Sequence, residues 1–180
     1  LPAFNVDGLP DKAVAESRER VRAALPSMGL ALPARRITVN LAPADILKEG
    51  SHFDLPIALG LLAAMEVLAS DQIADYIALG ELSLDGSILP VAGVLPAAMG
   101  AVGDDLGLIC PAACGGEAAW AGGREILAAP SLIALINHFK GTQLLSPPEP
   151  RMGEAASSRL DLLDIKGQET AKRALEVVAA

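Results

Sequence analysis

The spacing of hydrophobic and polar residues predicts strands and helices in alternation. A strand over Ala3–Val6 leads to a helix that opens at Pro10 and Asp11, because proline in the first turn and an acid at the positive end of the helix dipole favour a start there. A second strand follows over Arg36–Leu41, where apolar residues alternate. The buried stripe of the helix between the two strands consists of Val14, Val21, Leu25 and Met28.

The middle of the chain predicts a buried helix and a β-hairpin. The helix runs from Asp54, a good N-cap, to about Leu68, and it is apolar nearly all round, which is typical of a central helix. The hairpin pairs Tyr76–Leu84 with Ser87–Val91, because the Asp-Gly dipeptide between them is a strong tight-turn signal.

Helices and strands continue to alternate up to residue 140. The further predicted elements are a helix at Gly93–Ala101, a strand at Leu106–Cys110, a helical turn at Glu117–Trp120, a strand at Glu125–Ala128 and a helix from the cap Ser131 to Lys140. This order indicates an α/β or α+β sandwich over residues 1–140. Prolines, glycines and serines mark residues 141–158 as a linker, so that a second unit begins at residue 159.

Composition narrows the class of protein. The chain is 52% hydrophobic, which is enough for a full core, but only 3% aromatic, which argues against a surface that reads bases by stacking. No apolar run reaches the ~18 residues that a membrane span needs, and no signal peptide is visible. Cys110 and Cys114 are the only cysteines, and we expect them to be reduced in a cytoplasmic protein.

The net charge of −8 is unevenly spread along the chain. Acidic residues dominate from Glu66 to Pro130, which argues against a general nucleic-acid binder, whereas the first third carries seven of the 14 basic residues. A local face that contacts DNA phosphates would consist of Arg18, Arg22, Arg35, Arg36 and Lys48. The simpler interpretation is a solvated face in which these cations pair with Glu16, Glu19 and Glu49.

A divalent cation site is the other candidate that charge suggests. Asp45, Glu49 and Asp54 lie close together in the sequence, but loop carboxylates at such spacing more often cap helices or pair with arginines. The spacing of the two cysteines is a weak hint of metal binding, because two ligands do not make a structural zinc site. We therefore predict no metal site.

Three stretches together resemble one known family. They are Gly8–Ala24, which contains Gly-Leu-Pro-Asp-Lys-Ala-Val-Ala-Glu-Ser-Arg; Arg35–Gly60, which contains Lys-Glu-Gly-Ser-His-Phe-Asp-Leu-Pro-Ile-Ala; and Gly80–Gly93, which reads Gly-Glu-Leu-Ser-Leu-Asp-Gly-Ser-Ile-Leu-Pro-Val-Ala-Gly. They are similar to the N-terminal domain of the YifB/ComM family of magnesium-chelatase-related AAA+ proteins. The resemblance extends over essentially the whole chain.

The family resemblance implies a fold and a function for the larger protein. The implied fold is the Lon-protease-like sandwich of the ribosomal-protein-S5 domain 2 type, followed by the start of an AAA+ module. The whole protein is then expected to be a homo-hexameric ring that uses ATP and Mg to act on DNA. In ComM-like members this activity is that of a branch-migration helicase in natural transformation and homologous recombination. A chelatase activity receives no support from the sequence.

The last residues resemble the entry to an AAA+ module. In complete proteins of the family, the turn formed by Lys166, Gly167 and Gln168 is expected near the adenine of the nucleotide. A phosphate-binding G-x-x-x-x-G-K-[ST] loop would follow such an opening, but the chain reaches Ala180 without one. We therefore expect the chain to be the front part of a larger protein, and to need no cofactor of its own.

The Lon-like fold raises the possibility of a serine protease, which uses a serine nucleophile and a lysine base. The stretch Lys48–Asp54 takes the place of the Lon serine motif, but Ser51 lies one position early. After Gly93, where the Lon lysine would follow, the chain has Leu95. We therefore predict no catalytic residues and a noncatalytic accessory domain that serves DNA contact, ring assembly or partner docking. A protease and a pure oligomerisation platform are the alternatives.

Overall fold

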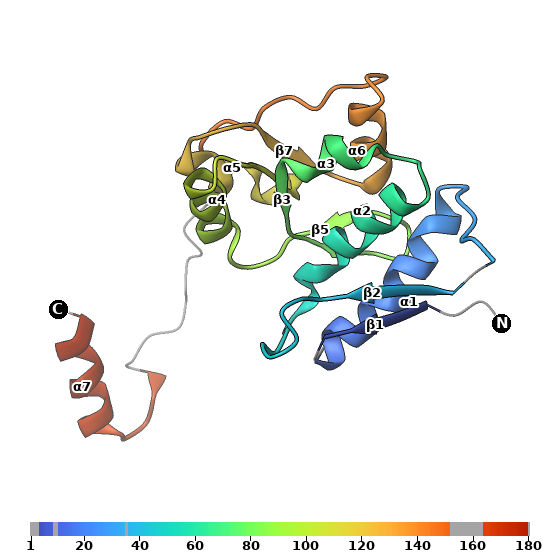
Figure 1. The fold of residues 1–180 in the computed structure, drawn as a ribbon. Coiled ribbons are helices and arrows are strands. Elements are labelled where there is room, and N and C mark those ends of the chain that lie inside the picture. Colours follow the sequence, from blue (N-terminus) through green and yellow to red (C-terminus); the bar gives the residue numbers. More distant parts are fainter. Residues whose placement is uncertain (1–3, 9–10, 35, 152–163, 180) are drawn as a thin grey trace.

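The structure, a computed structural model, describes two parts of the chain: residues 4–151, with 9–10 and 35 left out, and residues 164–179. The first part is a mixed α/β unit with parallel strands, which confirms the predicted α/β class. The second part contains α7 (Glu169–Ala179), drawn in red in Figure 1. Among the described residues, no helix has the length and apolar character needed to cross a membrane.

The first strands and helix form as the sequence pattern predicts. Strand β1 (Phe4–Asp7) pairs in parallel with β2 (Ile37–Asn40), and α1 (Lys12–Ser27) connects them. Asp11 caps α1, because its Oδ1 accepts a hydrogen bond of 2.7 Å from the Val14 amide. This β-α-β arrangement places one face of α1 against the rest of the unit (Figure 1).

The main sheet has three parallel strands in the order β3-β6-β7. The connection from β3 to β6 contains a β-hairpin and helix α4, and three short helical turns connect β6 to β7. The strands are β3 (Tyr76–Ala78), β6 (Gly107–Pro111) and β7 (Ile126–Ala129). The helical elements are α4 (Val94–Gly103), η2 (Ala112–Cys114), α5 (Gly115–Ala118), η3 (Ala119–Ala121) and α6 (Leu132–Phe139).

The predicted hairpin is shorter than the sequence suggests. Strands β4 (Glu81–Leu82) and β5 (Ile88–Leu89) pair antiparallel around the Asp-Gly turn, where Gly86 has a φ of 86°. Tyr76–Ala78 does not belong to this hairpin but to the main sheet, and the amide of Leu79 continues that pairing with a 3.1 Å hydrogen bond to the Ile109 carbonyl. A local turn signal cannot reveal that distant partner.

The central helix also differs from its predicted length. Helix α2 (Asp54–Ala64) ends four residues before Leu68, and Glu66 adopts a φ of 58°, which stops the helix. A further helix, α3 (Ser70–Ala74), was not predicted. The side chains of α2 are nevertheless buried along most of its length, which confirms its central position.

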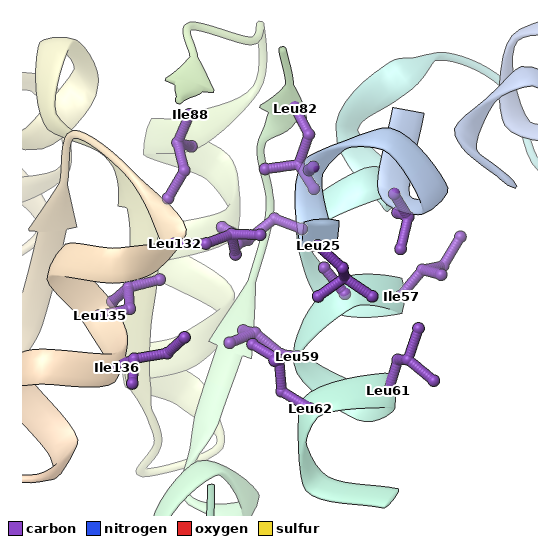
Figure 2. Packing of buried hydrophobic residues seen from close by; sticks show 14 of the residues in the cluster. Leu25, Ile57, Leu59, Leu61, Leu62, Leu82, Ile88, Leu132, Leu135 and Ile136 are labelled. Atoms are coloured by element: carbon purple, nitrogen blue, oxygen red, sulfur yellow. The ribbon is translucent and has the colours of Figure 1, made fainter. Parts of the chain in front are cut away.

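The hydrophobic residues of the main sheet divide between its two faces. Ile109 and Leu127 point to the first face, whereas Leu108 and Cys110 point to the second, because successive side chains of a strand alternate. On the first face lies cluster one, built mainly by α1, α2 and α6, whose leucines and isoleucines meet in Figure 2. On the second lies cluster two, which α4 and α5 cover. One sheet therefore joins two hydrophobic cores.

Candidate functional site

The loop between β2 and α2 is held against the start of α1. It contains most of Lys48–Asp54, the stretch that takes the place of the Lon serine motif. The Asp11 amide donates to the Lys48 carbonyl at 2.9 Å, and Asp11 Oδ2 accepts from the Gly50 amide at 3.1 Å. The hydrogen bond from the Val14 amide lowers the pKa of Asp11, and the Gly50 amide contributes in the same direction. Asp11 thus positions the turn η1 (Ser51–Phe53) that leads into α2.

At the start of α2, a buried ion pair joins three elements. Arg20 of α1 binds Asp54 with two hydrogen bonds, Nε to Oδ2 at 2.5 Å and Nη2 to Oδ1 at 3.0 Å. The Asp54 side chain is fully buried and that of Arg20 is 19% exposed. Asp54 Oδ2 also accepts from the amide of Leu82 in β4 at 3.0 Å. The hydrogen bond to Asp54 raises the pKa of Arg20, which keeps the guanidinium protonated.

The prediction that Asp54 caps α2 is wrong. Phe53 occupies the N-cap position, and no side chain caps this helix end. The oxygens of Asp54 point instead to Arg20 and Leu82, so they are not free to accept from the first turn of α2. Because both of its oxygens are engaged in these contacts, Asp54 is not free to join Asp45 and Glu49 in a divalent cation site. No group of three His, Cys, Asp or Glu side chains within the described ranges could hold a metal ion.

Ser51 lies beside this ion pair, and its partner is acidic. Its hydroxyl donates to Oε2 of Glu81 in β4. A carboxylate is a weak base for a serine hydroxyl, and a Lon-type site needs an amine at this point. The Lys48 amine donates to the Pro43 carbonyl, and the side chain after the turn at Gly93 and Val94 is the aliphatic Leu95. In the described part of the chain, the contacts of Ser51 therefore do not form a serine–lysine dyad.

The residues predicted to contact DNA are placed in different environments. Arg18 and Arg22 are exposed on α1, and Arg36 is exposed just before β2. Arg18 Nε lies 3.0 Å from Glu19 Oε1, so one pairing of the kind expected for a solvated face is present. Lys48 is only 5% exposed, and Arg35 lies outside the described residues. DNA contact stays a prediction, and the structure leaves Arg18, Arg22 and Arg36 as its exposed candidates.

The turn predicted to approach the nucleotide directly precedes α7. Lys166, Gly167 and Gln168 are exposed, and Gly167 and Gln168 have φ angles of 70° and 60°. The Gln168 carbonyl accepts from the Lys172 amide at 3.0 Å, which starts the helix. Leu175 and Val178 of α7 are 55% and 85% exposed, so these two apolar side chains are uncovered in the structure. Nucleotide binding by this turn stays a prediction for the whole protein.

The two cysteines are free thiols in cluster two. Cys110 and Cys114 are both buried, and Cys110 is fully inaccessible. Burial raises the pKa of Cys110 to about 12, and the neighbouring Cys114 adds to the shift. The Cys110 thiol therefore stays protonated and unreactive at neutral pH.

Arg20 and Glu81 are site residues that the sequence pattern does not predict. Arg20 is one of the basic residues of the first third, and its buried partner Asp54 is 34 positions away. One signal was present: Arg20 directly precedes Val21 of the buried stripe, and an acid opens the otherwise apolar helix α2. For Glu81, the local sequence contains no comparable signal.

Comparison with known proteins identifies the family. The family model "Subunit ChlI of Mg-chelatase" matches residues 1–113. "Uncharacterized protein YifB" of Escherichia coli is 39% identical over 180 residues, covering 100% of this chain and 36% of the relative. "Competence protein ComM" of Haemophilus influenzae is 40% identical over 184 residues, covering 99% of this chain and 36% of the relative.

A mycobacterial protein is a further relative. "Uncharacterized protein Rv2897c" of Mycobacterium tuberculosis is 37% identical over 181 residues, with 100% of this chain and 36% of the relative covered. The chain thus spans little more than a third of the length of the curated relatives that it matches. The predicted resemblance to YifB and ComM is confirmed. With a match over more than half of its residues, the chain belongs to the family of the subunit ChlI of Mg-chelatase.

Proposed function

We propose that the α/β unit is a noncatalytic accessory domain of a larger, ATP-driven DNA-remodelling protein similar to ComM. The observation that carries this proposal is the 40% identity to "Competence protein ComM", which extends over 99% of the chain. In the whole protein, ATP and Mg would bind to the AAA+ part, DNA would be the partner, and six copies would form a ring. The α/β unit would contribute DNA contact, ring assembly or partner docking.

The polar cluster at the start of α2 supports a noncatalytic role. Its side-chain interactions between Arg20 and Asp54 and between Ser51 and Glu81 connect protein groups to each other. Among the described residues, no buried side-chain nitrogen or oxygen lacks a hydrogen-bond partner. A site poised for proton transfer needs an effective base within reach of its nucleophile, and the Ser51 hydroxyl donates to the Glu81 carboxylate, which is a weak base for a hydroxyl. The cluster therefore serves to hold α1, α2 and β4 together.

The exposed arginines supply the simplest way for the unit to contact DNA. Arg18 and Arg22 are four positions apart on α1, which places them on one helix face at the spacing of neighbouring side chains. Guanidinium groups bind phosphate oxygens through several donors, and they do so without reading the sequence. Glu19 beside Arg18 weakens this face, so binding by this unit alone is expected to be weak and sensitive to salt.

Fluorescence anisotropy with single-stranded and forked DNA over a salt series tests this contact. We expect binding that weakens linearly with salt on a log–log plot, and that falls at least ~10-fold in the Arg18→Glu/Arg22→Glu variant. The matched control is Arg124→Glu/Lys140→Glu, which changes the net charge equally at exposed residues elsewhere. This control should retain most of the binding.

Two results would contradict DNA contact by this unit. One is no binding at low salt, which would place DNA contact in the rest of the protein and leave assembly or docking as the role of the unit. The other is an equal loss in both charge-reversed variants, which would show a response to net charge rather than to the face on α1.

A further inference from the structure

The residues after α6 do not leave the α/β unit directly but run back across it. We call Leu145–Arg151 the strap. In Figure 1 this stretch, in orange, passes from α6 towards α5. At its start, Leu145 packs against cluster one and its amide donates to His138 Nδ1 at 3.0 Å. A segment that its composition marks as a linker is thus in contact with the folded unit.

The strap ends on a pair of glycines in α5. The Arg151 amide donates to the Gly116 carbonyl at 3.1 Å. A Cβ atom on Gly115 would lie 2.9 Å from Pro148 Cβ, and one on Gly116 would lie 3.0 Å from Arg151 Cβ. Both distances are shorter than ordinary carbon contacts, so the strap approaches this closely only because both residues lack side chains.

Gly116 differs from Gly115 in a way that makes the strap testable. A Cβ on Gly115 would also lie 2.5 Å from Ala128 Cβ in the main sheet. For Gly116, the three nearest atoms all belong to Arg151 and Glu149 of the strap. A side chain at Gly116 would therefore displace the strap and leave the core of the unit in place.

A cavity along the strap is lined by Trp120, whose fluorescence can report whether the strap is docked. Its volume is about 980 Å³, and Pro147, Pro148 and Arg151 line it together with Trp120 of η3. Trp120 is the single tryptophan of the chain and is 57% exposed with the strap in place. Movement of the strap would change the exposure of this ring.

We propose that the strap can dock on the α/β unit and be released from it. Its state would then set the position at which the chain leaves the unit towards the rest of the protein. Three prolines keep it extended before docking, so docking costs little conformational entropy, yet a single described backbone hydrogen bond holds its end. When the strap is docked, the chain leaves the α/β unit at Arg151 and not at Lys140, the residue that follows α6. Released, residues 141–151 add a reach of up to roughly 34 Å, at ~3.1 Å per residue of extended chain. The inference holds whether or not the unit contacts DNA.

Amide exchange at Arg151 and acrylamide quenching of Trp120, both on the whole 180-residue chain, test the strap. In the unmodified chain we expect the Arg151 amide to exchange at least ~10-fold more slowly than in an unstructured peptide. Gly116→Val should remove this protection and increase quenching of Trp120. The matched control Gly100→Val, at a helix position with no neighbouring atom within 4 Å, should change neither.

A second variant keeps the test decisive if Gly116→Val disturbs the fold. Arg151→Pro removes the donor of the strap's terminal hydrogen bond and changes nothing in the hydrophobic clusters. It should increase quenching of Trp120 while the thermal unfolding midpoint stays within a few degrees. The proposal is overturned if Arg151 exchanges at the unprotected rate in the unmodified chain, or if Trp120 is quenched equally in Arg151→Pro and the unmodified chain.

Discussion

At the scale of single residues, Arg20 and Asp54 show how one buried charge depends on another. Asp54 is fully buried and receives hydrogen bonds from Arg20 and from the Leu82 amide. A buried ion pair adds little net stability over apolar residues of the same volume, because both charges lose their hydration. Removal of one partner is costly, since it leaves the other charge buried without compensation. We therefore expect the two side chains to have a large coupling energy, even if the pair as a whole adds little to the free energy of unfolding.

A double-mutant cycle measures this coupling. Arg20→Met and Asp54→Asn should each lower the free energy of unfolding by about 3–5 kcal/mol. The double variant should lose clearly less than the sum, with a coupling energy above ~2 kcal/mol in urea unfolding. The control is the exposed pair Arg18 and Glu19, where Arg18→Met and Glu19→Gln should couple by less than ~1 kcal/mol. Equal coupling in both cycles would refute a special role for the buried pair.

The same two residues mark the limit of what sequence reveals at this scale. The pattern predicts the stripe of Val14, Val21 and Leu25 correctly, because helical periodicity is a local property. It assigns Asp54 to a cap, because the local sequence shows an acid before an apolar helix and not the arginine 34 positions earlier. Partners that are distant in sequence decide the role of a buried charge, and single-sequence patterns do not contain them.

At the scale of elements, the connection between β3 and β4 is hydrogen-bonded to the start of α2, and it thereby holds α2 beside the hairpin. Gly80 lies in this connection, where its amide donates to the His52 carbonyl and its carbonyl accepts from the Leu55 amide, both at 3.0 Å. The sequence predicts a single hairpin strand through this point. The chain instead divides into β3 and β4, because β6 offers β3 a parallel partner and Gly80 bonds to the start of α2. Tertiary pairing overrides the local pattern here.

Gly80→Ala tests how tightly these elements are packed. Its Cβ would lie 2.9 Å from Ile88 Cγ2 and 3.1 Å from Leu55 Cδ2, so we expect the free energy of unfolding to fall by about 1–3 kcal/mol. Thermal or urea unfolding measures the change. Gly100→Ala is the matched control, and it should be neutral or stabilising by up to ~1 kcal/mol, since it lies in open space on α4. A neutral result for Gly80→Ala would show that the connection is loosely packed.

At the scale of the whole molecule, the main sheet connects the two hydrophobic clusters. Ile109 belongs to cluster one, while its neighbours Leu108 and Cys110 belong to cluster two. A defect on one face should therefore be felt on the other, and residues 4–151 should unfold in one cooperative step. The sequence predicts the α/β class from the order of its elements, but it does not show which strands share the sheet.

Leu62→Ala tests this cooperativity. Leu62 is fully buried in cluster one, so the substitution should cost about 2–5 kcal/mol. We expect the unfolding transition reported by Trp120, which lies beside α4 in η3, to shift by the full amount. Ile133→Ala, at a position that is 45% exposed, should change it by less than ~1 kcal/mol. An unshifted Trp120 transition in Leu62→Ala would mean that the two faces unfold separately.

The Arg20–Asp54 pair also determines which junction resists heat. Hydration of charged groups becomes less favourable as temperature rises, so the desolvation penalty of a buried ion pair shrinks on warming. Apolar burial gains no comparable advantage at high temperature. Below the cooperative transition, the meeting point of α1, α2 and β4 should therefore resist local opening on warming, whereas the ends of α3 and α4, which lack such a pair among the described contacts, should open locally more often.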